Sequence, residues 1–340
     1  MPLNTELTNS YGSVYVGLDA SERFSNNFET YSEGTRWLGI LFAFLSSVCF
    51  SVSATLVKDI RDVDPMILLS IRGAVQIVVM ILVALKNSLN LVGPKDYKLL
   101  IQLQGFLAGM MLSLLYYSFR KLPIGDATTI VFSSPAIVIV LSFVFLSEPC
   151  GVLRIMVICL LTTGVVLVAR PPFLFEMSKS PPQYDAVGYV CAFLTTLFSA
   201  VNIVVLRKCS KIHYSVMIFN SSVWSIVAAA LFFSLVPVDA NHIGSELSAL
   251  GRWSAWGMIM ATAVAGLLGQ ILMVTALAIE SAGKVSVARS FDIVLTYAIQ
   301  IYFFKEIPTV SCAVGALFIL FSVVCMGFER NIYSVCDFIP

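Results

Sequence analysis

The sequence predicts an all-α polytopic membrane protein with ten transmembrane helices, arranged as two inverted five-helix repeats. Three observations predict it: the composition, a series of long apolar runs and a weak internal repeat. Of the 340 residues, 58% are hydrophobic and only 12% are charged, whereas about 25% of the residues in an ordinary soluble domain are charged. The composition therefore excludes a conventional soluble enzyme.

The apolar runs have the length that a membrane requires. A bilayer core about 30 Å thick needs roughly 20 residues of helix. Ten runs meet this need, at approximately 38–57, 66–85, 99–119, 127–146, 155–169, 187–206, 214–236, 255–279, 285–304 and 309–327. The fifth run is short and the break between the eighth and ninth is the weakest, so nine or eleven spans remain alternatives.

The segments outside the runs indicate which side of the membrane they occupy. Residues 1–36 are polar and lack a signal-peptide pattern, so the first run is expected to direct insertion. A slight excess of Lys and Arg on the side of the termini places both termini in the cytoplasm. The expected organisation is a cytoplasmic tail (1–36), a first repeat (37–170), a linker (171–186), a second repeat (187–327) and a cytoplasmic tail (328–340). The pattern does not distinguish the plasma membrane from an endomembrane.

Segments 122–148 and 280–306 resemble one another at an offset of 158 residues. Three pairs are identical at this offset: Gly125 and Gly283, Phe145 and Phe303, and Glu148 and Glu306. If each half contains five spans, the odd number forces the second half to enter the membrane from the opposite face. Inverted repeats place a shared cavity near the bilayer midplane, and rocking of the halves exposes it to each side in turn.

Two charged residues lie inside the ninth run, where a charge is costly. An Arg or Asp at the centre of a spanning helix costs about 2.5–3.5 kcal/mol, so such residues normally face protein or water. Arg289 and Asp292 are three residues apart, on one helical face and within reach of an ion pair. One interpretation is a self-neutralising pair that only packs. The other is that the pair lines the cavity, with Asp292 holding the guanidinium until a substrate anion competes for it.

Arg72 and Gln76 lie one turn apart on one face of the second run. No acidic residue of that run can neutralise Arg72. It therefore bonds to backbone carbonyls, reaches Asp126 or Asp292 across the bundle, or faces an anion. A guanidinium presents a planar fork that suits carboxylate or phosphate, so two such groups on one cavity would select a small organic anion.

Pro135 lies inside the fourth run and predicts a kink, because proline removes a helical hydrogen bond. Ser133 and Ser134 precede it. Hydroxyls and freed carbonyls at such a kink can face a ligand, and a kink needed only for packing is an equal alternative. In repeat register, Ser134 corresponds to Asp292, so the two sites are expected to oppose each other.

Glycines and uncharged polar residues occur in the middle of other runs. Gly105 and Gly109 in the third run, and Gly266 and Gly269 in the eighth, are expected to let helices approach closely. Five midspan amides are Gln104, Asn202, Asn220, Gln270 and Gln300. The candidate substrate-binding residues are Arg72, Gln76, Gln104, Ser134, Arg289 and Asp292.

Other kinds of chemistry lack the residues that they need. With only two histidines, no metal site and no cofactor are expected. The net charge is +1 and the basic residues are scattered, so no nucleic-acid partner is expected. No HExxH motif or partnered nucleophile indicates an intramembrane enzyme. The expected partners are the lipid bilayer and a small anionic substrate, and nothing indicates or excludes a homo-oligomer.

Several segments resemble a known family. The stretches "GDATTIVFSSPAIVIVLSFVFLSE", "IRGAVQ", "LVGPKD" and "LVARPPFLF" resemble the EamA-type drug/metabolite transporter superfamily, and closely subfamily G of solute carrier family 35. The resemblance runs from about Gly39 to Met326. It implies ten helices in two inverted repeats, cytoplasmic termini and transport of small solutes by alternating access. One departure is Gln104, which stands where relatives often carry arginine.

The sequence therefore favours a carrier for a small organic anion. Carboxylates are favoured over nucleotide sugars, because no aromatic cluster suited to recognising a base is evident. A facilitator or exchanger is expected, since a paired Asp292 does not require proton coupling. Two alternatives remain: a nucleotide-sugar transporter, the class associated with solute carrier family 35 as a whole, and a membrane scaffold that binds a partner protein and moves nothing.

Overall fold

The computed structural model describes residues 36–59, 64–122, 124–148, 151–170, 174, 186–235, 253–304 and 310–329. Its elements are α2 (Arg36–Asp59), α3 (Pro65–Lys86), the 3-10 helix η2 (Lys95–Tyr97), α4 (Lys98–Lys121), α5 (Ile124–Val131), α6 (Ser134–Leu146), α7 (Val152–Ala169), α9 (Ala186–Lys208), α10 (Tyr214–Leu235), α12 (Trp253–Ile279), α13 (Ala282–Arg289), α14 (Phe291–Phe304) and α15 (Val310–Gly327). The described part of the chain is helical and contains no strand.

Nine stretches of the described residues are long and apolar enough to cross a membrane. Their mean hydropathies range from 1.6 to 2.5. The predicted all-α membrane architecture is therefore confirmed. Residues 1–35 and 330–340 of the expected tails, most of the linker 171–186, and Glu306 lie outside the described residues.

Two of the expected spans are broken rather than continuous. α5 ends at Val131 and α6 begins at Ser134, one residue before Pro135. The Ser133 hydroxyl donates to the Ile130 carbonyl at 2.6 Å and so satisfies one acceptor that the break exposes. The second break separates α13 from α14 at Ser290, whose amide donates to the Val287 carbonyl at 3.0 Å.

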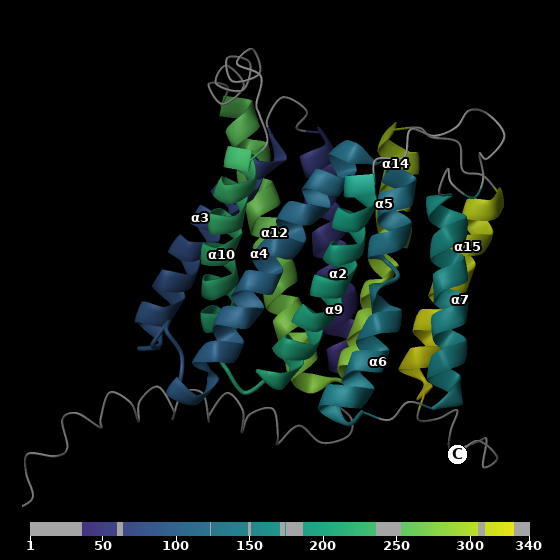
Figure 1. Cartoon of the computed structure of the whole chain (residues 1–340), viewed down its shortest axis with the longest axis horizontal. Helices are drawn as coiled ribbons and strands as arrows, with labels where there is room; N and C mark the ends of the chain where they lie inside the picture. The colour runs from purple at the N-terminus through teal and green to yellow at the C-terminus, as the bar shows by residue number, and fades with distance from the viewer. Residues whose placement is uncertain are drawn as a thin grey trace, which may run out of the picture.

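The helices stand side by side with α3 and α10 at one edge of the bundle and α7 and α15 at the other (Figure 1). α2 packs mainly against α12, and α4 packs against both α9 and α10. α13 and α14 both pack against α2. The break between α13 and α14 is therefore held against the middle of α2.

Glycine permits the closest helix contacts, because it brings no side chain between two backbones. A Cβ at Gly109 of α4 would lie 2.6 Å from the Trp224 carbonyl oxygen of α10. A Cβ at Gly164 of α7 would lie 2.9 Å from the Gly315 oxygen of α15. These two contacts set the spacing of their helix pairs.

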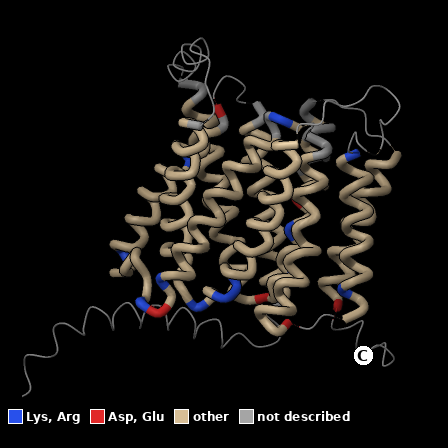
Figure 2. The backbone as a smooth tube through the Cα atoms, in the orientation of Figure 1, with Lys and Arg blue, Asp and Glu red and all other residues tan. Residues whose placement is uncertain are grey.

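Charged residues gather at the two ends of the bundle, and its middle is almost entirely uncharged (Figure 2). Large apolar side chains project outward from the helices: Leu82, Val140, Phe143, Val190 and Phe193 keep between 57% and 62% of their surface exposed. This outer surface suits contact with lipid.

Candidate functional site

Arg72 projects from α3 toward α12. Its Nη2 lies 3.5 Å from the Gly266 carbonyl oxygen, and a Cβ at Gly266 would lie only 2.6 Å from the Arg72 Cζ. The guanidinium therefore occupies space that any other residue at position 266 would fill. Within the described part of the chain, Arg72 forms no ion pair. The sequence also allowed Arg72 to reach Asp126 across the bundle, but the Asp126 side chain lies outside the described residues.

Arg289 and Asp292 lie on either side of the second helix break. Arg289 is in the last turn of α13, and Asp292 is in the first turn of α14. The carboxyl end of a helix favours a cation and the amino end favours an anion. The break therefore stabilises both charges, and the charge of Asp292 also attracts Arg289.

α2 supplies a polar face that holds this break. Ser47 donates to the Arg289 carbonyl at 3.2 Å, and Ser51 donates to the Asp292 carbonyl at 3.1 Å. The Ser51 hydroxyl also donates to the Asp292 carboxylate. The Arg289 Cζ lies 5.0 Å from the centroid of the Phe50 ring, within the range of a cation–π interaction.

The two arginines share one polar neighbourhood inside the bundle. Their charges interact repulsively, and Tyr116 on α4 lies close enough to interact with the charge of Arg72. Both guanidinium groups are strongly desolvated by the surrounding protein, yet both side chains keep an intermediate share of accessible surface. Both side chains are thus enclosed by the bundle without being fully buried.

Two of the uncharged candidates, Gln76 and Gln104, are buried and form hydrogen bonds to neighbouring helices. Gln76 is 2% exposed and its Oε1 accepts a hydrogen bond from Ser222 at 2.9 Å. Gln104 is 3% exposed and donates to the Asn202 Oδ1 at 3.3 Å. Among the described residues, the Gln76 Nε2 and the Gln104 Oε1 have no hydrogen-bond partner. Both amides thus join helices while each keeps one buried polar atom unsatisfied.

Ser134 is the first residue of α6 and is 9% exposed. Its helix packs against α9 and α13. No described hydrogen bond joins it to Arg72, Arg289 or Asp292. The substrate-binding role of all six candidates stays a prediction.

Sequence reasoning missed the supporting residues Ser47, Phe50, Ser51 and Tyr116, because none of them carries a charge at neutral pH. A signal was available for α2. Ser47 and Ser51 are four residues apart, so they lie on one face of an otherwise apolar helix. In the described residues, no group of three His, Cys, Asp or Glu side chains is arranged to hold a metal ion.

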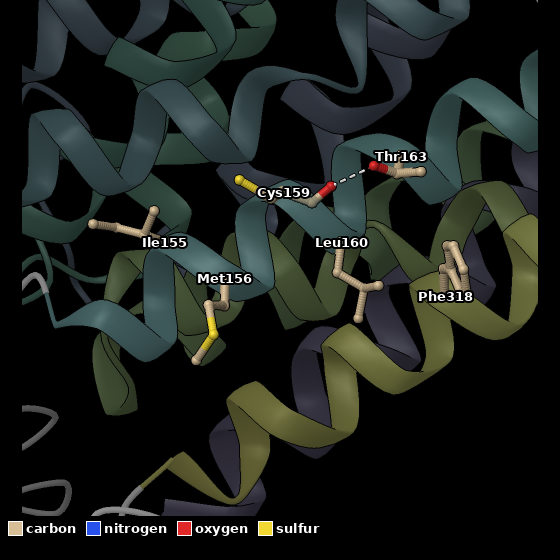
Figure 3. Close-up of a pocket in the computed structure, with 6 residues that line it drawn as sticks. All are labelled: Ile155, Met156, Cys159, Leu160, Thr163 and Phe318. Carbon is tan, nitrogen blue, oxygen red and sulfur yellow. Dashed lines mark hydrogen bonds between the residues drawn. The ribbon is translucent and has the colours of Figure 1, made fainter. Parts of the chain in front are cut away.

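A separate apolar groove lies on the outer surface between α7 and α15 (Figure 3). It has a volume of about 390 Å³ and is lined by Ile155, Met156, Cys159, Leu160, Thr163 and Phe318. The Thr163 hydroxyl donates to the Cys159 carbonyl at 2.8 Å and so is satisfied within its own helix. With no charged group in its lining, the groove suits lipid chains rather than a polar solute.

The apolar helices define a polytopic membrane protein. The EamA-like transporter family matches the sequence over residues 37–170 and 186–328. The chain therefore belongs to the EamA-like transporter family.

Individual relatives agree with this assignment. Solute carrier family 35 member G1 of Homo sapiens is 32% identical over 295 residues, which are 84% of this chain and 77% of the relative. The Pseudopaline exporter CntI of Pseudomonas aeruginosa (strain UCBPP-PA14) is 28% identical over 300 residues, 86% of this chain and 96% of the exporter. The predicted relation to subfamily G of solute carrier family 35 is confirmed.

One solved crystal structure has a similar fold. It superposes with a TM-score of 0.68 at 14% sequence identity, and the match covers 86% of this chain and 98% of that chain. At this identity the likeness concerns the fold alone.

Proposed function

We propose that this protein is a carrier for small organic anions, with carboxylates favoured, and that it works by alternating access as a facilitator or exchanger. The observation that carries the proposal is that two guanidinium groups lie beside the same stretch of α12: Arg72 lies against Gly266, and Arg289 lies over the Phe50 ring, which is next to Gly269. The family match and the exporter among the relatives support a transporter rather than an enzyme or a scaffold.

The charge balance explains why an anion fits. Arg72, Arg289 and Asp292 together carry a formal charge of +1. Coulomb interactions strengthen where water is excluded, so the repulsion between the two arginines is costly in this setting. A bound carboxylate relieves that repulsion and offers the bidentate geometry that a guanidinium prefers. A cation would increase the repulsion.

The alternating-access part of the proposal rests on the repeat. α5 covers 124–131 and α13 covers 282–289, so both ends of these helices differ by 158 residues. The same offset relates α7 (152–169) to α15 (310–327), and the last residue of α4 to that of α12. The helix breaks thus recur at the register found in the sequence, which supports two homologous halves.

Ten spans follow if α13 and α14 act together as the ninth. Neither helix alone has the length of a span, but together they extend from residue 282 to residue 304. α5 and α6 form the fourth span in the same way. With five spans in each half, the second half is inverted relative to the first and both termini lie on the same side of the membrane, which the slight excess of Lys and Arg makes the cytoplasmic side.

Uptake into proteoliposomes tests the proposal. Purified protein is reconstituted and offered labelled mono-, di- and tricarboxylates, nucleotide sugars and organic cations. We expect carboxylate uptake that falls roughly 10- to 100-fold in Arg72→Ala and in Arg289→Ala, the range that corresponds to losing one charge-assisted interaction. Lys95→Ala, which removes an exposed cation from η2, is the matched control and should leave uptake unchanged.

Several outcomes would count against the carrier or its substrate. Uptake of cations alone would overturn the anion assignment, and preference for nucleotide sugars would replace the carboxylate class. Folded protein without any flux would favour a scaffold. Flux that disappears when the proton gradient is collapsed would exclude a simple facilitator or exchanger.

A further inference from the structure

Six charged side chains gather at one end of the bundle, away from the two internal arginines. They are Glu148 after α6, Arg154 on α7, Arg207 on α9, Glu280 after α12, Lys284 on α13 and Glu329 after α15. We call this set the charged cluster. Two members come from the first half of the chain and four from the second, so the cluster joins the halves.

Glu148 caps α13 across the boundary between the halves. Its Oε1 accepts from the Ala282 amide at 3.0 Å, and its Oε2 lies 3.5 Å from the Gly283 amide. Ser281, the residue that precedes α13, makes no side-chain cap of its own. The amino terminus of α13 therefore depends on a carboxylate from the other half for its first hydrogen bonds.

The remaining members neutralise one another at short range. The Arg154 Nε and Nη2 donate to the two oxygens of Glu329 at 2.6 and 3.1 Å. Lys284 lies 3.7 Å from Glu280 and 3.6 Å from Glu329. Arg154 and Arg207 lie 3.8 and 4.0 Å from Glu148. Three anions and three cations leave no net charge.

Most of the cluster is closed to water in this conformation, and Arg207, at 27%, is its most exposed side chain. The exposed fractions of the side chains of Glu148, Arg154 and Glu329 are 11%, 4% and 9%. Separating buried charges without water leaves each of them uncompensated, whereas separating them as water enters restores their solvation. Opening of this end and hydration of its charges are therefore linked events.

One short helix connects the cluster to the internal site. α13 is 8 residues long, or about 12 Å at 1.5 Å per residue. Its first turn is held by Glu148, and its last turn carries Arg289. A shift of α13 at its amino end therefore has to move the guanidinium at the other end.

We propose that the charged cluster is the gate that closes one face of the carrier, and that Glu148 is its latch on α13. The gate presupposes the carrier function proposed above and places the closed end at the face that carries the termini. Release of Glu148 opens this face and repositions Arg289 in the same movement.

Thiol accessibility tests the gate without any substrate. Ser286 lies on α13, one turn after the capped residues, and is 3% exposed. In Ser286→Cys protein in oriented membrane vesicles, a membrane-impermeant thiol reagent applied to the face of the cluster should label slowly. Adding Glu148→Gln should raise the labelling rate roughly tenfold or more, as the loss of a charged hydrogen bond shifts the population.

Two controls separate opening from general loosening. Asp96→Asn makes the same chemical change at an exposed carboxylate in η2, outside the cluster, and should not raise the rate. Ser113→Cys introduces a thiol at a 0% exposed position of α4, and it should stay unlabelled in the Glu148→Gln background. The parent protein without introduced cysteines gives the background of the native thiols.

Unchanged labelling of Ser286→Cys in folded Glu148→Gln protein would overturn the gate, as would equal labelling of Ser286→Cys and Ser113→Cys. Where Glu148→Gln does not fold, Glu148→Asp replaces it. That variant keeps the charge on a side chain one methylene shorter, and it must also raise the labelling rate. The readout needs no transport, so a protein that labels as expected but carries no anion would refute the proposed function and leave the latch intact.

Discussion

Arg72 can remain inside the bundle because the neighbouring helix α12 has a glycine, Gly266, at the point of contact. Gly266 has no side chain, so the guanidinium approaches the α12 backbone, and the Gly266 carbonyl accepts its weak hydrogen bond at 3.5 Å. A single contact of this length leaves most of the five donors of a guanidinium for another ligand. Arg289 is held in a comparable way, because the Phe50 ring lies 5.0 Å from its Cζ.

The first residue-scale prediction concerns Gly266→Ala. Its Cβ would lie 2.6 Å from the Arg72 Cζ, so the guanidinium has to leave its position. We expect anion uptake to fall roughly tenfold or more while the protein remains folded. Uptake into proteoliposomes, together with the melting temperature, measures both effects. Gly257→Ala on the same helix meets nothing within 4 Å and should transport normally; a similar loss in that variant would contradict the explanation.

His213 gives a second residue-scale prediction, outside the spanning helices. Its Nδ1 accepts from the Ser215 amide at 3.2 Å at the start of α10. Burial lowers the pKa of His213 from its ordinary value of 6.5 to about 4. The folded state therefore resists protonation, and its stability should fall as the pH drops from 6.5 toward 4.

His213→Gln removes this titration and retains an acceptor. Between pH 6.5 and pH 4, the melting temperature of the variant should fall less than that of the original protein. Equal losses in the two proteins would show that other groups dominate the acid sensitivity.

At the scale of elements, the proposed function depends on the two broken helices, and the two breaks have different causes. The first break precedes Pro135, which supplies no amide hydrogen for a continuous helix. The second occurs at Ser290 without proline or glycine, and side chains of α2 bond to the backbone on both sides of it. A break that depends on a neighbouring helix is a tertiary feature.

This difference explains what the sequence could predict. The apolar runs and the 158-residue offset predicted most helices and their register, and Pro135 predicted an interruption of the fourth span. Nothing within residues 285–304 predicted the break at Ser290, because its cause lies on α2. For the site, the cost of charge in hydrocarbon identified Arg72, Arg289 and Asp292. The uncharged partners Ser47, Ser51 and Phe50 look like ordinary residues of an apolar helix until the fold places them beside the break.

An element-scale prediction tests the contact between α4 and α10. In Gly109→Ala, the new Cβ would lie 2.6 Å from the Trp224 oxygen and 2.9 Å from the Ser225 nitrogen, and neither backbone atom can rotate away. Forced separation of packed elements typically costs about 1–3 kcal/mol, so the melting temperature should drop. Gly327→Ala, where the nearest atom is 3.8 Å away, is the matched control and should melt normally.

At the scale of the whole molecule, ten spans require both termini to lie on the same side of the membrane. For the protein in an internal membrane, we expect epitope tags at the two ends to be stained together once the plasma membrane is permeabilised with digitonin, which leaves internal membranes closed. A count of nine spans would leave one tag unstained. A tag inserted beside Leu174, which is 49% exposed, should be protected under the same conditions because it lies beyond the fifth span.

The bare contact between Gly164 and Gly315 has a mechanical consequence. Two backbones that touch through glycine, with no side chain between them, offer nothing that can rotate to accommodate sliding. α7 and α15 also stand together at one edge of the bundle, far from α3 and α10 (Figure 1). If the halves rock, the contact between α7 and α15 acts as the pivot. Small tilts about this pivot then become larger displacements at the edge formed by α3 and α10.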